Sequence, residues 1–278
     1  MELLSGRKPL APAGIEPLLR DLIHERTGIF FEPERFDVLL EKIEPLAAQR
    51  NCYSLLDYYY LLKYEENGVE DWARVMDALS VQETYFWREM GQVRLLCDQL
   101  VPQWFRKSSL PLQIWSAACA TGEEPYSILM ALLEAGWGSH PIEICASDAS
   151  PAALEKCQRA IYREKAFRCF PAELRNKYFK PVGNEWQLRP DIAARVTFKR
   201  ANLLATEEIS MLARAPFVFC RNVFIYFSPH AIRQTVAAFA SRMPPRGCLF
   251  VGASESLLRL TADFELQEMG DNFVYVRT

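Results

Sequence analysis

Residues 112–148 read LQIWSAACATGEEPYSILMALLEAGWGSHPIEICASD. The apolar run 112–115 suits a buried strand, and residues 116–122 carry small side chains that let the backbone approach a ligand closely. An amphipathic helix follows, and a second strand over 142–147 ends at Asp148. This order of strand, loop, helix, strand and acid predicts a nucleotide-type site, with Asp148 placed to accept hydrogen bonds from a ribose diol.

The start of the helix in this stretch has its own sequence signal. Thr121 and Glu124 have the spacing of a capping box and Pro125 follows, so we predict that this pair caps the helix. The dinucleotide fingerprint G-x-G-x-x-G is absent, which disfavours a dehydrogenase. A loop of small residues followed by an acid suits an adenosine ligand without a pyrophosphate, such as S-adenosylmethionine. The alternative for Asp148 is a plain helix N-cap.

Length and composition limit the classes of protein to consider. The chain has 278 residues, half of them hydrophobic, and a formal charge of −3. The length suggests two domains, or one large domain with an appendage, and the composition predicts a sizeable core. The net charge gives no reason to expect tight nucleic-acid binding. Eight cysteines without a Cys-x-x-Cys pair and three scattered histidines predict buried free thiols and no metal site. Without an apolar signal core or an apolar run near ~18 residues, we expect a cytoplasmic protein that does not insert into membranes.

The hydrophobic periodicity predicts two domains. Apolar stripes with helical spacing occur at 15–26, 34–49, 54–62 and 72–79. We predict a helical domain over 1–79 and a second domain over 80–278 that begins with a linker at about 80–90. In the second domain, strands alternate with helices and predict an α/β fold with a parallel sheet covered on both faces. Three further features are expected: a helix with Leu154, Cys157 and Ile161 inward, an inserted β hairpin within 178–198, and a terminal hairpin over 264–277.

The run IWSAACATGEEPYSI at 114–128 resembles the hallmark of the chemotaxis receptor methyltransferase (CheR) family, which comprises S-adenosylmethionine-dependent protein-glutamate O-methyltransferases. Further stretches similar to the family cover nearly the whole chain in the expected order: TYFWRE at 84–89, ASD at 146–148, AIYR at 160–163, NLL at 202–204, FCRNVFIYF at 219–227 and GASE at 252–255. The resemblance implies a Rossmann-like class I methyltransferase sheet, an N-terminal all-helical domain and a small inserted β subdomain. It also implies S-adenosylmethionine as cofactor and S-adenosylhomocysteine as product.

The motifs place the expected site residues along the second domain. Cofactor contacts are expected at Gln82, Thr84, Arg88, Glu123, Asp148, Asn202, Leu203, Arg221 and Asn222. Catalytic roles are expected for Arg88 and Tyr226. Tyr226 would orient the acceptor, and Arg88 would close over the cofactor and attract an acidic substrate. Without the motif, a surface salt bridge is the favoured reading of Arg88.

An anionic acceptor agrees with the residues before Tyr226. Amine methyltransferases often carry Asn-Pro-Pro-Tyr here, whereas this chain has Val223 and Phe224 in place of both prolines. A glutamate acceptor, with an unperturbed pKa near ~4.3, is ionised at neutral pH and requires no general base. Catalysis then depends on alignment and on exclusion of water.

Several positions depart from the family pattern. Gln82 replaces a common asparagine, Trp87 a phenylalanine, and Ala253 a histidine. Classical members carry a strongly basic helix that meets the receptor. The stretch 34–49 has more acidic than basic residues, so electrostatic steering of an acidic receptor would be weak or inverted. In some relatives the inserted subdomain adds a C-terminal receptor tether as a strand. Two prolines, Pro181 and Pro190, would interrupt such pairing, so binding independent of a tether is expected.

The expected partner is therefore the cytoplasmic helical region of a chemoreceptor, bound by a monomer. One rival reading is a catalytically weak, cofactor-sensing scaffold in a chemosensory array. Another is a methyltransferase for a small-molecule carboxylate or for RNA, and the acidic balance disfavours RNA.

Overall fold

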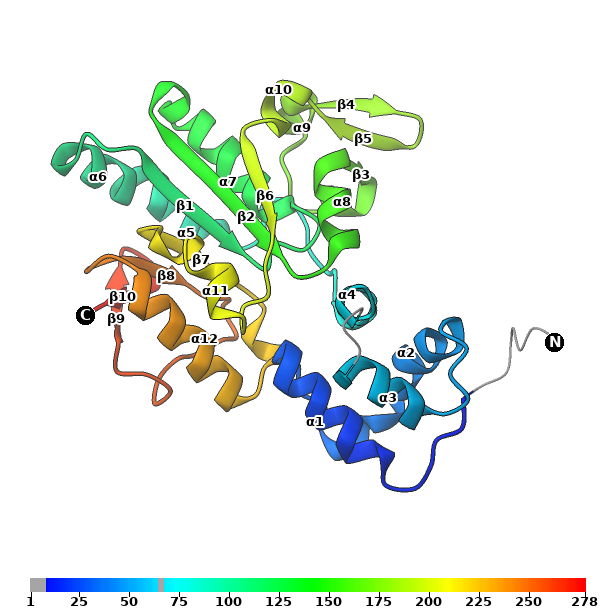
Figure 1. Cartoon of the computed structure of the whole chain (residues 1–278). Coiled ribbons are helices and arrows are strands. Elements are labelled where there is room, and N and C mark those ends of the chain that lie inside the picture. Colours follow the sequence, from blue (N-terminus) through cyan, green and yellow to red (C-terminus); the bar gives the residue numbers. More distant parts are fainter. Residues whose placement is uncertain (1–8, 65–67) are drawn as a thin grey trace.

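The computed structural model describes residues 9–64 and 68–278, and the helical N-terminal part lies beside the sheet-containing part (Figure 1). The N-terminal part consists of a short 3-10 turn and four helices: η1 (Pro33–Arg35), α1 (Ile15–Thr27), α2 (Phe36–Gln49), α3 (Leu55–Tyr64) and α4 (Gly68–Leu79). Their apolar stripes meet in one core that includes the fully buried Leu19, Ile23, Leu39 and Ile43. The four predicted helical stripes are confirmed.

The larger part is built on a seven-stranded sheet with the order β6-β2-β1-β7-β8-β10-β9. The strands are β1 (Leu112–Ala117), β2 (Ile142–Asp148), β6 (Val196–Arg200), β7 (Phe217–Phe219), β8 (Cys248–Phe250), β9 (Phe264–Met269) and β10 (Asn272–Arg277). The first five strands in this order are parallel, while β10 pairs antiparallel with both β8 and β9. The predicted parallel sheet and terminal hairpin are both confirmed.

Successive side chains of β1 enter two different cores because a strand alternates its side chains between the faces of a sheet. Leu112 and Ile114 pack with one set of helices, whereas Trp115 and Ala117 pack with the other. The first face is covered by α5 (Met90–Leu95), α6 (Val101–Lys107), α7 (Glu123–Glu134), η3 (Trp137–Ser139) and α8 (Pro151–Arg159). The second is covered by α11 (Thr206–Ile209), η5 (Leu212–Arg214) and α12 (Pro229–Arg242) (Figure 1).

A π turn, η2 (Leu96–Leu100), joins α5 and α6 into one helical run. Pro102 explains this irregularity, since it lacks an N–H group and its ring would clash with the carbonyl of residue 98 in a regular α-helix. The run from Met90 to Lys107 is therefore helical throughout but not uniformly α-helical.

The inserted subdomain is a three-stranded antiparallel sheet, β3 (Ile161–Arg163), β5 (Glu185–Leu188) and β4 (Phe179–Val182), in that order. The predicted hairpin is confirmed, but Ile161 does not lie on the preceding helix. That helix ends at Arg159, Ala160 adopts a left-handed conformation with φ 50°, and Ile161 begins β3. Three short elements complete this region: η4 (Glu164–Phe167), α9 (Ala172–Tyr178) and α10 (Pro190–Ala193).

The two prolines of the subdomain have different positions. Pro181 lies in β4, which is an edge strand. Pro190 is the first residue of α10. The expectation that Pro190 would interrupt a strand is therefore wrong, because a proline at the first helical position starts a helix without losing a hydrogen bond.

Hydrogen bonds join the helical region to the carboxyl ends of the strands. Asp77 of α4 accepts from the Ser150 hydroxyl at 2.5 Å and from the Ala152 N–H at 3.1 Å, so it helps to cap α8. The Asn202 side-chain amide donates to the Arg26 carbonyl at 2.7 Å. The His24 ring and the Ser228 hydroxyl lie 2.7 Å apart. These hydrogen bonds hold the helical region over the carboxyl ends of the strands, where a ligand site is expected.

The segment after α1 also pairs with a short 3-10 turn, η6 (Phe224–Tyr226), and the residue that follows it. The Phe30 N–H donates to the Tyr226 carbonyl at 2.9 Å, and Ile29 and Phe227 form an antiparallel bridge. Gly28 has φ 78°, and a Cβ there would lie 2.9 Å from atoms of the Phe227 ring.

Two properties of the whole described chain complete the fold. Among residues 9–64 and 68–278, no helix combines the length and the apolar character needed to cross a bilayer. The eight cysteines, which all lie among the described residues, form no disulfide, and five of them are buried: Cys97, Cys119, Cys157, Cys220 and Cys248. Cys169 is exposed, which differs from the expectation of buried thiols.

The packing of Gly28 on Phe227 can be tested with a matched pair of glycines. Gly14 has a similar φ of 81° but nothing within 4 Å of an added Cβ. Both Gly14→Ala and Gly28→Ala introduce left-handed strain of about 1–2 kcal/mol, whereas only Gly28→Ala adds a clash, of about 1–3 kcal/mol. We expect urea denaturation to show a larger loss of unfolding free energy for Gly28→Ala, and equal losses would contradict tight packing at this contact.

Candidate active site

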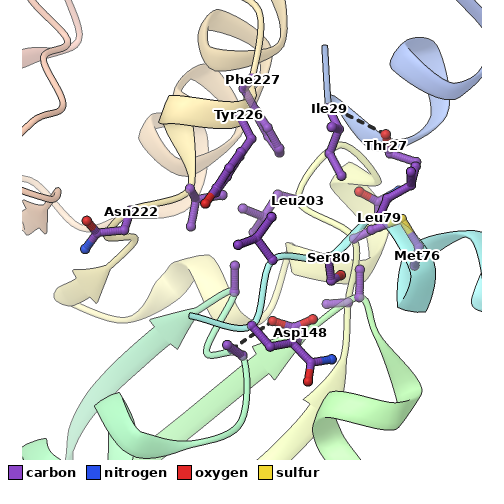
Figure 2. Close-up of a pocket in the computed structure, with 18 residues that line it drawn as sticks. Thr27, Ile29, Met76, Leu79, Ser80, Asp148, Leu203, Asn222, Tyr226 and Phe227 are labelled. Carbon is purple, nitrogen blue, oxygen red and sulfur yellow. Dashed lines mark hydrogen bonds between the residues drawn. The ribbon is translucent and has the colours of Figure 1, made fainter. Parts of the chain in front are cut away.

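A crevice lies at the carboxyl ends of the strands, between the sheet and the helical region. Residues of both the sheet-containing part and the helical region line it. In Figure 2, Asp148 lies at one side of this space, and Tyr226 with Asn222 lies across from it. The predicted residues that line it are Gln82, Asp148, Asn202, Leu203, Asn222 and Tyr226.

Asp148 ends β2 and is buried, with 8 % of its surface exposed. One carboxylate oxygen accepts from the Ala120 N–H and the other from the Ser150 N–H, each at 2.9 Å. Burial raises the pKa of Asp148 to about 6, although these backbone donors act in the opposite direction. Ser150 is the N-cap of α8, since its hydroxyl accepts from Ala153 N–H at 3.0 Å. The Asp148 carboxylate therefore faces the crevice rather than serving as the helix cap itself.

The loop between β1 and α7 contains three residues with left-handed backbones, and all three have small side chains. Ala118 and Ala120 have φ values of 53° and 48°, and Gly122 has 95°. A left-handed conformation costs roughly 1–2 kcal/mol for a residue with a Cβ, and such strain is typical of functional sites. At Gly122 a Cβ would lie 3.1 Å from both the Cys157 sulfur and the Tyr162 hydroxyl oxygen. Both alanines line the crevice, so the backbone approaches its interior closely, as the sequence predicts.

The predicted capping box at the start of α7 is wrong. Gly122 in the left-handed conformation is the N-cap, and no side chain caps the helix. Glu124 instead accepts from the Ser116 hydroxyl at 2.6 Å and from Arg221 Nε at 2.7 Å. The Thr121 hydroxyl donates to the neighbouring Glu123 at 2.6 Å. The buried partner Arg221 therefore takes Glu124 away from the backbone N–H that a capping box requires.

Arg221 holds the linker in place. Besides Glu124, its guanidinium donates to the carbonyls of Arg88 and Glu89, at 3.2 and 2.9 Å. Every nitrogen of this side chain thus has a protein acceptor, and the residue is 7 % exposed. Arg221 thus positions the linker and also lines the smaller cavity beside the crevice, and its expected cofactor contact stays a prediction.

Arg88 lies between two residues with left-handed backbones, Trp87 and Glu89, with φ values of 68° and 50°. Its guanidinium donates to the Asn222 side-chain oxygen at 2.6 Å and to the Glu83 carbonyl at 3.1 Å. Arg88, Asn222 and Thr84 line a smaller cavity that shares Ala118 and Ala120 with the main crevice. Arg88 is therefore next to the Asn222 end of the crevice.

The linker reaches this position because Phe86 anchors it in the subdomain. Phe86 is fully buried and contacts the rings of Tyr162, Phe167, Phe170 and Phe179, with centroid distances of 4.8–5.6 Å. Its N–H donates to the Ala166 carbonyl at 2.9 Å. Trp87, which replaces a family phenylalanine, packs edge-on against Phe170 at 4.8 Å.

Asn202 and Leu203 lie side by side at the crevice, but their roles differ. Leu203 is 5 % exposed and presents an apolar surface. The Asn202 amide is engaged by protein groups, since its nitrogen donates to the Arg26 carbonyl and its oxygen accepts from the Leu204 N–H at 3.1 Å. Asn202 therefore joins the two parts of the chain while lining the site.

Glu123 is not brought into the main crevice. It is 4 % exposed and lines a separate cavity with Gln82, Thr84 and Lys156. Burial raises the pKa of Glu123, while the Thr121 hydroxyl lowers it. Lys156 donates to the Gln82 side-chain oxygen at 2.7 Å, which closes this cavity against the linker. Glu123 thus shares a cavity with the predicted contacts Gln82 and Thr84, but not with Asp148.

Several residues that line the crevice were not predicted. Thr27, Ile29, Met76 and Leu79 come from the helical region, and Figure 2 shows them on the side of the crevice opposite the loop. Met76 and Leu79 belong to an ordinary apolar stripe, which predicts core packing and does not distinguish a ligand-facing position. Thr27 and Ile29 follow the first helical stripe and carry no sequence signal for a site. Glu255 was also missed as a site residue, although it ends the GASE motif, and its carboxylate contacts the turn that carries Tyr226.

Comparison with known proteins gives consistent matches along the chain. A family described as "CheR methyltransferase, all-alpha domain" matches residues 17–80, and one described as "CheR methyltransferase, SAM binding domain" matches residues 82–273. The chain is 35% identical over 267 residues to "Chemotaxis protein methyltransferase 2" of Vibrio cholerae, which covers 93% of this chain and 91% of the relative. It is 31% identical over 258 residues to "Chemotaxis protein methyltransferase" of Escherichia coli, with coverage of 90% and 86%.

These matches run in one order through both parts of the fold, and the SAM-binding match includes every residue that forms the sheet-side wall of the crevice. The chain belongs to the CheR family of S-adenosylmethionine-dependent methyltransferases.

Proposed function

We propose that this protein transfers a methyl group from S-adenosylmethionine to glutamate side chains in the cytoplasmic helical region of a chemoreceptor. The observation that carries the proposal is the crevice at the carboxyl ends of the strands, in which Asp148 lies across from Tyr226 and Asn222. We further propose that the protein acts as a cytoplasmic monomer, with residues 1–79 meeting the receptor and residues 80–278 holding the cofactor.

The residues of the crevice fit the adenosyl part of the cofactor. Each Asp148 oxygen accepts a single backbone N–H, which leaves acceptor capacity for the two ribose hydroxyls. Leu203 and Ala118 offer apolar surface to a flat ring. The amino acid end would lie toward Arg88 and Asn222, where the smaller cavity opens from the crevice.

The bound cofactor supplies an electrophilic methyl group on a positively charged sulfur. The acceptor glutamate is already ionised at neutral pH, so the protein has to align it rather than deprotonate it. The Tyr226 hydroxyl orients the acceptor carboxylate at the crevice mouth. Arg88 and the linker limit access of water to the methyl group.

The charge of α2 argues against recognition by long-range attraction. Residues 34–49 hold two cations, Arg35 and Lys42, and four acids, Glu34, Asp37, Glu41 and Glu44. The Lys42 ammonium also donates to the Ala78 carbonyl at 2.7 Å, so its charge is partly directed inward. The edge strand β4 contains Pro181, which offers no N–H for pairing with a tether.

The central test is transfer of labelled methyl to receptor fragments. We expect incorporation into a helical receptor fragment, with equal initial rates within about twofold for fragments with and without a C-terminal extension. A working tether would raise the effective concentration of the acceptor, so a rate loss of tenfold or more on truncation would contradict tether independence. No incorporation into any receptor of a panel, despite cofactor binding, would contradict the proposed substrate.

The raised pKa of Asp148 predicts a pH-dependent affinity. Ribose hydroxyls donate to the ionised carboxylate, so the affinity for S-adenosylhomocysteine should be full above pH 7 and fall as pH drops through about 6. One pH unit below that value the loss should approach about tenfold. Calorimetry from pH 5 to 8 measures this, and Asp148→Asn should bind more weakly with this pH dependence removed. A pH dependence that persists in Asp148→Asn would assign it to another group.

Arg88 provides a second test of the cofactor site. Hydrogen bonds to charged groups contribute about 1.5–3 kcal/mol, so Arg88→Ala should weaken S-adenosylhomocysteine binding roughly 10-fold or more and lower the rate of methyl transfer. Arg94→Ala, at an exposed position of α5, is the matched control and should leave both unchanged. Unchanged affinity and rate in Arg88→Ala would show that Arg88 has no role in the site.

A further inference from the structure

We propose that Glu255 is a positioning residue for methyl transfer, because its carboxylate sets the turn that carries Asn222 and Tyr226. This inference rests on the proposed function of the crevice. Glu255 itself does not line the crevice. It lines a neighbouring cavity together with Glu89 and Phe273.

Five backbone N–H groups converge on this one side chain. Oε1 accepts from Val223, Phe224 and Ile225 at 2.7, 2.6 and 3.3 Å. Oε2 accepts from Asn222 at 2.8 Å and from Gly252 at 2.6 Å. Four consecutive amides of the turn therefore share one acceptor group that comes from a different loop.

These bonds fix the conformation of both residues at the end of the crevice. Asn222 is left-handed, with φ 61°, and its side chain accepts from Arg88. The three-residue turn η6 that leads to Tyr226 is too short to be stable through its own hydrogen bonds. Glu255 supplies the acceptors that the N–H groups at the start of this turn lack.

The close approach of the two loops is itself specific. A Cβ at Gly252 would lie 3.0 Å from the backbone nitrogen and side chain of Asn222, so the loop that presents Glu255 needs glycine at this point. On the opposite side of the turn, the Tyr226 carbonyl accepts from the Phe30 N–H. The turn is thus held from one side by the helical region and from the other by Glu255.

A carboxylate is the only common side chain suited to this position. Its two oxygens accept from all five donors, whereas glutamine would place an NH₂ group against some of them. The turn is otherwise partly open to solvent, with Ile225 51 % exposed, so water would take over the lost bonds without fixing the geometry. A displacement near 1 Å at a reacting group can reduce the rate about 10²-fold.

The kinetic test is a double-mutant cycle between Glu255 and Tyr226. At saturating cofactor and acceptor, we expect Glu255→Gln to lower kcat at least about 10-fold and Glu255→Asp to lower it less. Each double variant combines Tyr226→Phe with one of the two Glu255 substitutions. If Glu255 acts through Tyr226, kcat of the double variant falls by a much smaller factor than the product of the factors measured for the two single variants. Glu268→Gln, at an exposed position of β9, is the control and should match the unmodified protein.

Hydrogen exchange provides a readout that needs neither cofactor nor acceptor. The amides of residues 222–225 should exchange at least about 10-fold faster in Glu255→Gln, while amides of β1 and β2 keep their protection. If Glu255→Gln does not fold, the same measurements on Glu255→Asp decide the question.

The outcomes separate this inference from the proposed function. Normal kcat in the Glu255 variants, unchanged exchange of the turn amides, or effects that multiply with Tyr226→Phe would overturn the role of Glu255 alone. Failure of the unmodified protein to methylate any receptor, measured in the same assay, would overturn the proposed function and this inference with it.

Discussion

The buried ion pair between Glu124 and Arg221 is the contact on which the geometry of the site depends. Its partners are separated by 97 positions in the sequence, their side chains are 13 % and 3 % exposed, and their atoms lie 2.7 Å apart. Burying two charges is costly unless the remaining groups are satisfied. Here Ser116 donates to Glu124, and the carbonyls of Arg88 and Glu89 accept from Arg221, so each charged group has further hydrogen-bond partners in the protein. One pair thus joins β1, α7, the end of β7 and the linker.

The linker brings Arg88 to the site because residues 86–89 are anchored at both ends, one end in the inserted subdomain and the other at Arg221. Phe86 is inserted among the aromatic rings of the subdomain, and the carbonyls of Arg88 and Glu89 are held by Arg221. Trp87 and Glu89 adopt left-handed backbones where the chain turns Arg88 toward Asn222, and this conformation has an energetic cost. Strain of this kind persists only where the surrounding contacts determine the conformation, and here they do.

The sequence was most informative where function depends on local pattern. The small-residue loop, the acid at the end of β2, the parallel sheet and the four N-terminal helices all follow from periodicity and residue size, and all are present. It failed where a distant partner changes a local preference. Glu124 has the spacing of a capping residue, but Arg221 binds it, and the three-residue strand β3 is too short to show a period of two. Likewise Thr27 and Ile29 line the crevice because the end of α1 and the segment after it contact Phe227 and Ser228.

The arrangement around Tyr226 agrees with chemistry in which alignment matters more than proton transfer. An ionised carboxylate needs no base, so the rate depends on how well the acceptor, the tyrosine and the cofactor are held relative to one another. The turn of Tyr226 is bound on one side by Glu255 and on the other by the Phe30 N–H of the helical region. Because the same helical region is the proposed receptor-binding element, a receptor that docks on it contacts a body already hydrogen-bonded to the residue that orients the acceptor. On this proposal, receptor binding and alignment of the acceptor would be coupled through the bond between the Phe30 N–H and the Tyr226 carbonyl.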